Sequence, residues 1–195
     1  MKYYNQRRYP HVPYPQFMDF PDDPYGKSAS VRGGGCGLCC ACMVVDQLTL
    51  KPFSVQQCAQ LSMDCGGNHD DGTDMEVFGP ALAEKFNLEY YATNDVARAV
   101  DELRNGGRVI LLVSGDREGY TGVFSHGEHY VVIISTTENE FCILDPDWTK
   151  NAYTQSEKDG LVRQDGYLLY ASHDVAEKDR VIGKNGYYIF KRKHP

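Results

Sequence analysis

The sequence has no apolar run near the roughly 20 residues that a helix needs to cross a bilayer. We therefore expect no insertion into a membrane. The 195 residues have ordinary hydrophobic and charged contents and are expected to form a single domain over 1–195. The start, "MKYYNQRRYP", lacks the apolar segment of a secretory signal. This absence favours a cytoplasmic protein, or a secreted one if a leader was removed upstream.

The chain also lacks a basic stripe. Its formal net charge is −7, and Lys and Arg are scattered apart from the terminal run "KRK". A surface that binds a phosphate backbone needs clustered cations, so we expect no nucleic acid partner. No internal repeat and no low-complexity segment is present in the sequence.

Cysteine, in contrast, is plentiful and unevenly placed. Four of the seven cysteines lie between Cys36 and Cys42, too close together on one helix for ordinary mutual bridging. Overlapping Cys-x-x-Cys spacings raise the alternative of a zinc site completed by Cys58, Cys65 or His69. The apolar residues between the clustered cysteines are typical of a helix and not of a zinc knuckle. We therefore expect reduced thiols and no metal.

Three parts follow one another along the chain. Residues 1–35 are rich in Tyr, Pro and Gly and are expected to wrap irregularly over the body, with one short strand near "KYYNQ". Residues 36–105 are expected to be mainly helical, and residues 106–195 mainly sheet. No cofactor is expected.

Capping residues mark the helices of the middle part. The capping-box pattern "SVQQ" predicts a helix over about 55–63. Thr73 with Glu76 repeats the pattern, and Pro80 should break or kink the helix that follows. Asn94 is expected to cap the next helix.

The last part contains the clearest strands. "RVILLV" is continuously apolar, which predicts a strand buried on both faces. "HYVVIIS" and "EFCILD", joined by "TTEN", predict an antiparallel hairpin in which His129 opens one strand and Asp145 closes the other. If the two residues pair directly, their Cβ atoms lie roughly 4.5 to 5.5 Å apart. A register shifted by one residue would place them on opposite faces.

Cys36 follows three glycines and opens an almost wholly apolar segment, "CGLCCACMVV". A helix there would be buried nearly all round, and a thiol at its N-terminus is expected to have a lowered pKa. Such a thiolate is a nucleophile, for which His129 could shuttle protons while Asp145 orients the imidazole. The other three cysteines of the segment are expected to be small buried hydrophobes: Cys39, Cys40 and Cys42.

Simpler interpretations exist for the histidine and the aspartate. Asp145, in "LDPDW", could only start a turn, and His129 could be a structural histidine. His126 competes for the role of the base, but it lies in a glycine-rich loop where its position is less fixed.

The segment "GCGLCCACMVV" resembles the nucleophile segment of the bacteriocin-processing-like cysteine peptidases, a papain-fold group related to the peptidases that cut double-glycine leaders. "GEHYVVI" resembles the histidine strand of that family and "FCILDPDW" its aspartate turn, in the same order. The resemblance implies an α+β, papain-like fold in which a central buried helix carrying Cys36 packs on an antiparallel sheet carrying His129 and Asp145. It also implies that Cys36 is the nucleophile, His129 the general base and acid, and Asp145 the residue that orients the histidine.

A papain-like site further needs a donor to the oxyanion, generally a glutamine that precedes the cysteine. Gln6, in "YYNQ", fits the family pattern best, and Gln16, in "PYPQF", is its rival. Gly35, Gly127 and Glu128 adjoin the cysteine and the histidine and are expected to contact the substrate.

By this resemblance the chain is a cysteine peptidase that hydrolyses a peptide or protein substrate through an acyl-enzyme. Two alternatives stay open: an inactive module that binds a peptide or protein on the same fold, and a papain-like amidase or acyltransferase. Leu38, Cys39 and Cys40 stand where the family commonly has Pro, Thr and Ser. We therefore expect a differently shaped helix start and surplus thiols that are open to oxidation.

Overall fold

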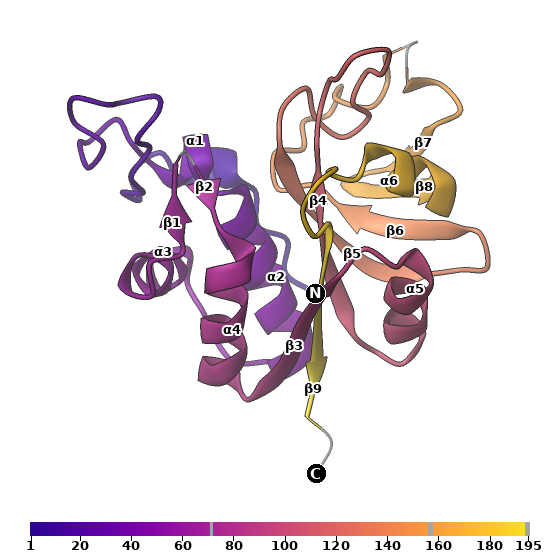
Figure 1. Ribbon diagram of the computed structural model, residues 1–195, viewed down its shortest axis with the longest axis horizontal. Coiled ribbons are helices and arrows are strands. Elements are labelled where there is room, and N and C mark those ends of the chain that lie inside the picture. The colour runs from indigo at the N-terminus through magenta and orange to yellow at the C-terminus, as the bar shows by residue number, and fades with distance from the viewer. Residues whose placement is uncertain (71, 156–157, 194–195) are drawn as a thin grey trace.

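The computed structural model describes residues 1–70, 72–155 and 158–193. Two lobes stand side by side, one of them mainly helical and the other built on a large sheet (Figure 1). This arrangement confirms the α+β architecture expected from the sequence. No helix in the described ranges is long and apolar enough to span a bilayer.

The helices and strands follow the chain in a mixed order. The helices are η1 (Gln6–Arg8), α1 (Val31–Gly34), α2 (Cys36–Thr49), α3 (Val55–Asp64), α4 (Met75–Phe86), α5 (Val96–Arg104) and α6 (His173–Asp179). The strands are β1 (Asn68–His69), β2 (Gly72–Thr73), β3 (Leu88–Thr93), β4 (Arg108–Val113), β5 (His129–Thr136), β6 (Glu140–Leu144), β7 (Val162–Asp165), β8 (Leu168–Ser172) and β9 (Tyr187–Arg192). Apart from the small β1-β2 pair, the strands form one antiparallel sheet in the order β3-β9-β4-β5-β6-β8-β7.

Helix α2 is the centre of the molecule. Every residue from Gly37 to Val45 is buried, as its nearly continuous apolar sequence predicts. The helix packs on β5, β4 and β9 with one side and on α3 and α4 with the other (Figure 1). The approach to the sheet is close at Gly37, where an added Cβ would lie 2.9 Å from Thr73 and 3.2 Å from Tyr130. Only glycine fits there without displacing its neighbours.

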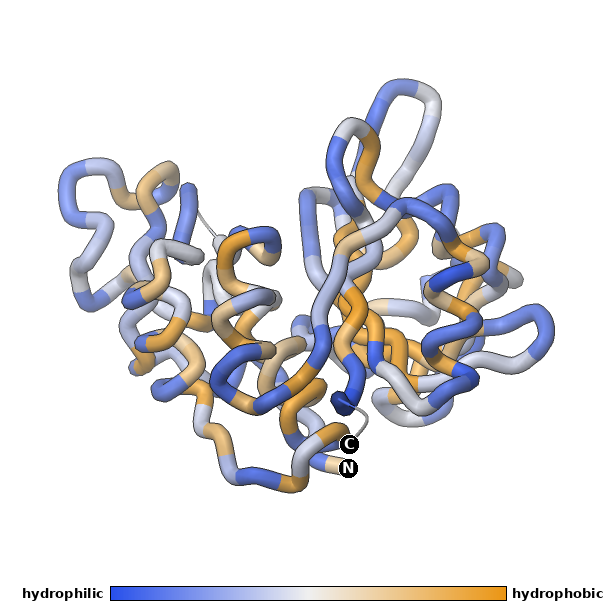
Figure 2. Tube along the Cα trace, turned by 60° about the horizontal axis from the view of Figure 1, so that its bottom comes forward, coloured by the Kyte–Doolittle hydropathy of each residue, from blue (hydrophilic) through white to orange (hydrophobic). Residues whose placement is uncertain are grey.

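The sheet is apolar on both faces. Along β4, Ile110 and Leu112 face the core around α2, whereas Val109, Leu111 and Val113 face a second core under α5 and α6. The prediction of a strand buried on both sides is therefore confirmed. In Figure 2 the hydrophobic colour is concentrated in the central strands, and several of the outer loops are hydrophilic.

Two helix caps differ by one residue from the prediction. Asp74, not Thr73, caps α4, and Asp95, not Asn94, caps α5. The Thr73 hydroxyl instead lies 2.8 Å from the buried Tyr14 hydroxyl, and the Asn94 side chain accepts a hydrogen bond from the loop before β9. Tertiary contacts thus use both side chains that the local pattern assigned to caps.

Two other expectations need correction. Pro80 does not break α4, which continues to Phe86, and the burial of Phe78, Leu82 and Phe86 stabilises the helix on both sides of the proline. The segment "KYYNQ" contains no strand, and its last residue begins the 3-10 turn η1. The capping box predicted at "SVQQ" is present in α3.

A buried carboxylate holds the loop that leads to β5. Asp179, at the end of α6, is fully buried and accepts hydrogen bonds from the Tyr120 hydroxyl and from the backbone N–H groups of Val123 and Phe124. The three distances lie between 2.8 and 3.0 Å. The loop therefore enters β5 from a fixed direction.

Replacing Asp179 with alanine is expected to lower the free energy of unfolding by about 2–4 kcal/mol, because two buried N–H groups and a hydroxyl lose their acceptor. Urea denaturation monitored by circular dichroism measures the change. Asp159→Asn, at an exposed position, is the control and should stay within about 0.5 kcal/mol of the unmodified protein. Equal stabilities of the two variants would contradict the role given to Asp179.

Candidate active site

Cys36 is the first residue of α2 and is partly exposed. The preceding Gly35 is the N-cap, and a Cβ at this position would lie 2.3 Å from Val31, so the tight turn between α1 and α2 requires glycine. The sulfur is reached by the backbone N–H groups of Gly37 and Tyr130. Free N–H groups at a helix N-terminus stabilise a negative charge.

His129 and Asp145 meet at the end of the hairpin. His129 is the first residue of β5, and Asp145 directly follows β6; His129 Nε2 lies 2.7 Å from Asp145 Oδ1. Because Val132 pairs with Leu144 and Ile133 with Ile143, Asp145 is not directly opposite His129 but two residues along, on the same face. Both side chains are buried.

His129 also connects to the thiol. Its side chain hydrogen-bonds to Cys36, and since Nε2 is engaged by Asp145, Nδ1 is the ring atom left for the sulfur. Burial opposes ionisation of Cys36, but the hydrogen bond from His129 and the charge of its ring outweigh this effect and lower the pKa of the thiol. The arrangement favours a thiolate beside an imidazolium.

The other two pKa values shift in the matching directions. Burial disfavours the charged imidazole, but the charge and hydrogen bond of Asp145 raise the pKa of His129 well above its ordinary value. Burial likewise opposes ionisation of Asp145, while His129 and further hydrogen-bond donors lower the pKa of this carboxyl. Charge therefore alternates along the row from sulfur to imidazole to carboxylate.

The carboxylate is held by residues that the sequence did not single out. Tyr153 donates its hydroxyl hydrogen to Asp145 Oδ2 at 2.7 Å, and the backbone N–H of Asp147 donates to Oδ1 at 2.7 Å. The Tyr3 hydroxyl donates to the backbone carbonyl of Asp145. The "DPD" sequence is a recognisable signal for the Asp147 contact, which is an Asx turn. Tyr153 and Tyr3 carry no such local signal.

The two glutamines have different surroundings. Gln6 lines the same cleft as Cys36, its Nε2 donates one hydrogen to the Arg32 carbonyl at 3.0 Å, and its buried Oε1 has no partner among the described residues. Gln16 is buried beneath Gly33 and donates to the Ser30 carbonyl at 2.6 Å. Of the two, only Gln6 lines the cleft.

A cleft of about 660 Å³ opens between the lobes at Cys36 and His129. Glu128 lines it and forms an ion pair with Lys184 at 2.7 Å. Gly35 and Gly127, both expected to contact substrate, are not among its lining residues. The earlier glycines of the run line it instead, together with residues of β2 and the start of α4: Gly33, Gly34, Gly72, Thr73, Asp74 and Glu76.

His126, the competitor for the role of the base, is not among the residues that line the cleft. His126 is exposed, and its Nδ1 lies 3.0 Å from Asp116. In the part of the chain that the structure describes, no group of three or more His, Cys, Asp or Glu side chains could hold a metal ion. Cys58, which the zinc alternative would use, donates its thiol hydrogen to the Leu38 carbonyl. All seven cysteines are free thiols.

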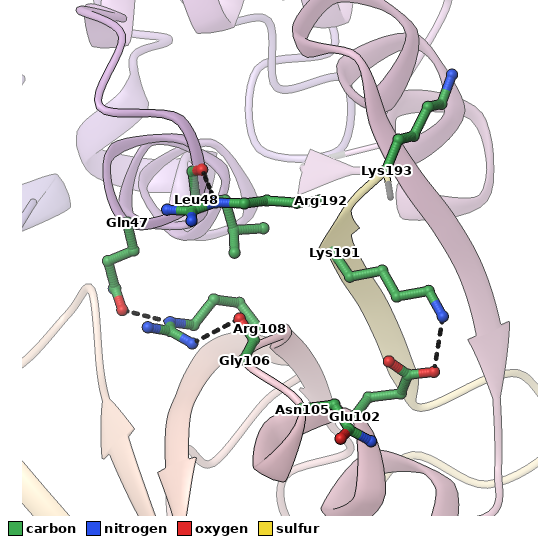
Figure 3. Close-up of a pocket in the computed structure, with 9 residues that line it drawn as sticks. All are labelled: Gln47, Leu48, Glu102, Asn105, Gly106, Arg108, Lys191, Arg192 and Lys193. Carbon is green, nitrogen blue, oxygen red and sulfur yellow. Dashed lines mark hydrogen bonds and ion pairs between the residues drawn. The ribbon is translucent and has the colours of Figure 1, made fainter. Parts of the chain in front are cut away.

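A second cavity, of about 630 Å³, lies at the opposite end of α2, and four of its nine lining residues are cationic: Arg108, Lys191, Arg192 and Lys193 (Figure 3). Arg108 donates to the Gly106 and Gly107 carbonyls beyond α5, and Arg192 donates to the Leu48 carbonyl in the last turn of α2. Cations at these positions satisfy carbonyls and oppose the negative ends of helix dipoles. This cavity has a structural explanation, and no cysteine, serine, threonine or histidine is among the described residues that line it.

Comparison with solved structures shows that two peptidases are similar to this chain in fold. The peptidase domain of Streptococcus ComA, a bifunctional ABC transporter involved in a quorum-sensing pathway, superimposes with a TM-score of 0.54 at 16% identity, over 81% of this chain and 91% of that one. A protein from Bacillus anthracis that is assigned as a C39-like peptidase gives 0.54 at 14% identity, over 95% and 96%. The chain has the fold of the C39 peptidases.

The C39 peptidase fold is the papain-like fold that the resemblance implied, with the cysteine on the central helix. No protein-family model and no curated protein sequence matches the chain. At such low identity the likeness establishes the fold, and the chemistry has to be argued from the side chains of the cleft.

Proposed function

We propose that this protein is a cysteine peptidase that hydrolyses peptide bonds with Cys36 as nucleophile, His129 as general base and acid, and Asp145 as the orienting residue. The observation that carries the proposal is the connected row of Cys36, His129 and Asp145, which starts at a helix N-terminus inside a cleft. A lowered thiol pKa beside a raised imidazole pKa is what a nucleophilic cysteine needs near neutral pH.

The reaction follows from these positions. The Cys36 thiolate attacks the carbonyl carbon of the scissile bond, and the carbonyl oxygen becomes an oxyanion. The tetrahedral intermediate collapses as the His129 imidazolium gives its Nδ1 proton to the departing amine, which leaves an acyl-enzyme. Water then attacks the acyl carbon while His129 takes up a proton from it. The acid product departs and the thiolate–imidazolium pair is restored.

We propose Gln6 as the side-chain donor to the oxyanion, together with the backbone N–H of Cys36. An amide nitrogen carries two hydrogens, and only one of those on Gln6 is used by the Arg32 carbonyl. The position of Gln6 in the wall of the cleft supports this assignment over Gln16.

The test is selective alkylation of the reduced protein with limiting iodoacetamide at about pH 6. A thiol with the ordinary pKa of about 8.5 is only about 0.3% ionised at that pH, so fast reaction requires a lowered pKa. Peptide mapping should place the label on Cys36, at least about tenfold faster than on the partly exposed Cys65. His129→Ala should remove that advantage, whereas His126→Ala, at an exposed histidine outside the cleft, should preserve it.

Slow labelling spread over several cysteines would overturn the proposal. The same result would favour an inactive module that binds a peptide in the cleft. Unchanged labelling in His129→Ala would show that the helix terminus alone activates the thiol, and His129 would lose its assigned role.

A further inference from the structure

Cys36 and Cys39 form a Cys-x-x-Cys pair in the first turn of α2. Helix geometry separates Cα atoms three residues apart by about 5 Å, inside the range of roughly 4.4–6.8 Å that a disulfide spans. Three glycines precede Cys36, and Gly37 follows it, so the backbone around the first cysteine is free of the restrictions that a Cβ imposes. The Cα separation of the pair is therefore compatible with a disulfide.

The two thiols differ in exposure and reactivity. Cys36 is partly exposed in the cleft and has a lowered pKa, so a dissolved oxidant reaches it in its reactive form. Cys39 is fully buried, and burial together with the neighbouring Cys42 and Cys36 raises its pKa well above the ordinary value. Cys39 is thus kept as an unoxidised thiol beside the cysteine that is oxidised first.

Cys40 is the competing partner for Cys36, and its surroundings argue against it. Its thiol donates a hydrogen bond to the Tyr130 carbonyl at 3.4 Å, which ties it to β5 next to His129. Turning Cys40 toward Cys36 would leave a buried carbonyl without its donor. Cys39 makes no hydrogen bond through its sulfur in the described residues, so it can turn without such a loss.

We propose that Cys36 and Cys39 form a reversible disulfide when the protein meets a hydroperoxide, and that this bond switches off the nucleophile and protects it. The inference rests on the reactive Cys36 of the proposed function. The thiolate attacks one oxygen of the peroxide, giving a sulfenic acid and releasing an alkoxide or hydroxide that takes up a proton. The Cys39 thiol then attacks the sulfenic sulfur, and the displaced hydroxide takes the Cys39 proton to form water. Two thiols lose two electrons, and the peroxide gains them.

The experiment compares the full chain with Cys39→Ala, Cys40→Ala and Cys42→Ala, three equal substitutions on one buried helix. Each reduced protein is treated with hydrogen peroxide, then with dithiothreitol, and is analysed by intact mass and peptide mapping. The unmodified protein, Cys40→Ala and Cys42→Ala should lose two hydrogens, gain a Cys36–Cys39 bond and recover labelling at Cys36 on reduction. Cys39→Ala should instead gain two oxygens at Cys36 as a sulfinic acid and stay unlabelled after reduction.

The proposal fails if the unmodified protein accumulates sulfinic acid as fast as Cys39→Ala, or if the bond joins Cys36 to Cys40. It also fails if Cys40→Ala loses reversibility and Cys39→Ala keeps it. Alkylation at about pH 6 separates this failure from that of the proposed function. If Cys36 labels fast but forms no bond to Cys39, only the disulfide proposal is refuted. If Cys36 labels slowly, both the disulfide and the proposed peptidase function are refuted.

Discussion

Replacing Cys36 with alanine is expected to reduce peptide hydrolysis by at least about 10³-fold, because the proposed reaction forms its acyl-enzyme on the Cys36 sulfur. The assay uses a pool of peptides from a digested proteome, which offers many different cleavage sequences, and new termini are counted by mass spectrometry. The helix itself should persist, because alanine is the best helix former and the position is partly exposed.

Cys65→Ala is the matched control. This cysteine is also partly exposed, but it ends α3 outside the cleft and its thiol donates only to the Ser62 carbonyl. Its loss should leave the rate of hydrolysis unchanged. Hydrolysis that survived in Cys36→Ala would assign the chemistry to another residue and would overturn the proposed function.

Local sequence patterns were sufficient to predict the helix and the two strands that carry the candidate site. The apolar segment after the glycines predicted α2, and the hairpin pattern predicted β5 and β6 with His129 and Asp145 at their ends. Such patterns show which residues are apolar enough to be buried, and this property can be read from each residue type without knowledge of its partners. Cap positions were less predictable, because Thr73 and Asn94 have the right chemistry for capping but are used in contacts with distant parts of the chain.

The register of the hairpin could not be derived from the sequence. Near the turn, Thr136 pairs with Phe141 and Ser135 with Cys142, and this register, continued unchanged, would put His129 and Asp145 on opposite faces. A bulge between Ile133 and Ser135 shifts the pairing by one residue and returns both side chains to one face. The His129–Asp145 contact thus depends on an irregularity that no local residue preference announces.

The surroundings of Asp145 were equally hidden. Tyr3 and Tyr153 are 142 and 8 residues from Asp145 in the sequence, and they become its neighbours only when the N-terminal segment and the segment between β6 and β7 pack against the hairpin. Tertiary packing selects such partners. A single sequence shows which residues are able to donate a hydrogen bond and leaves open which ones do.

Replacing Asp145 with alanine is expected to lower kcat/KM by about 10²–10⁴-fold and the free energy of unfolding by about 3–5 kcal/mol. The change leaves His129 Nε2, the Tyr153 hydroxyl and the Asp147 N–H without their common acceptor. Asp145→Asn keeps an oxygen that can accept from Nε2. An imidazolium donates from both nitrogens and needs no tautomer to be selected, so this variant should stay within about tenfold of the unmodified protein at pH 6.

The pH profile separates orientation from charge. The charge of Asp145 is the largest of the effects that raise the pKa of His129. Asp145→Asn removes this effect and keeps that of the Cys36 thiolate, so the pKa of His129 should fall and the alkaline limb of kcat/KM should move to lower pH. Stability follows the same linkage. The lowered pKa of Asp145 contributes stability above about pH 3.9 that is lost as pH falls through the folded value. The raised pKa of His129 contributes stability below about pH 6.5 that is lost as pH rises through its folded value. The free energy of unfolding of the unmodified protein should therefore exceed that of Asp145→Asn most clearly between about pH 3.9 and pH 6.5. In the kinetic measurement, an alkaline limb of kcat/KM that did not move would mean that Asp145 acts on His129 through position alone.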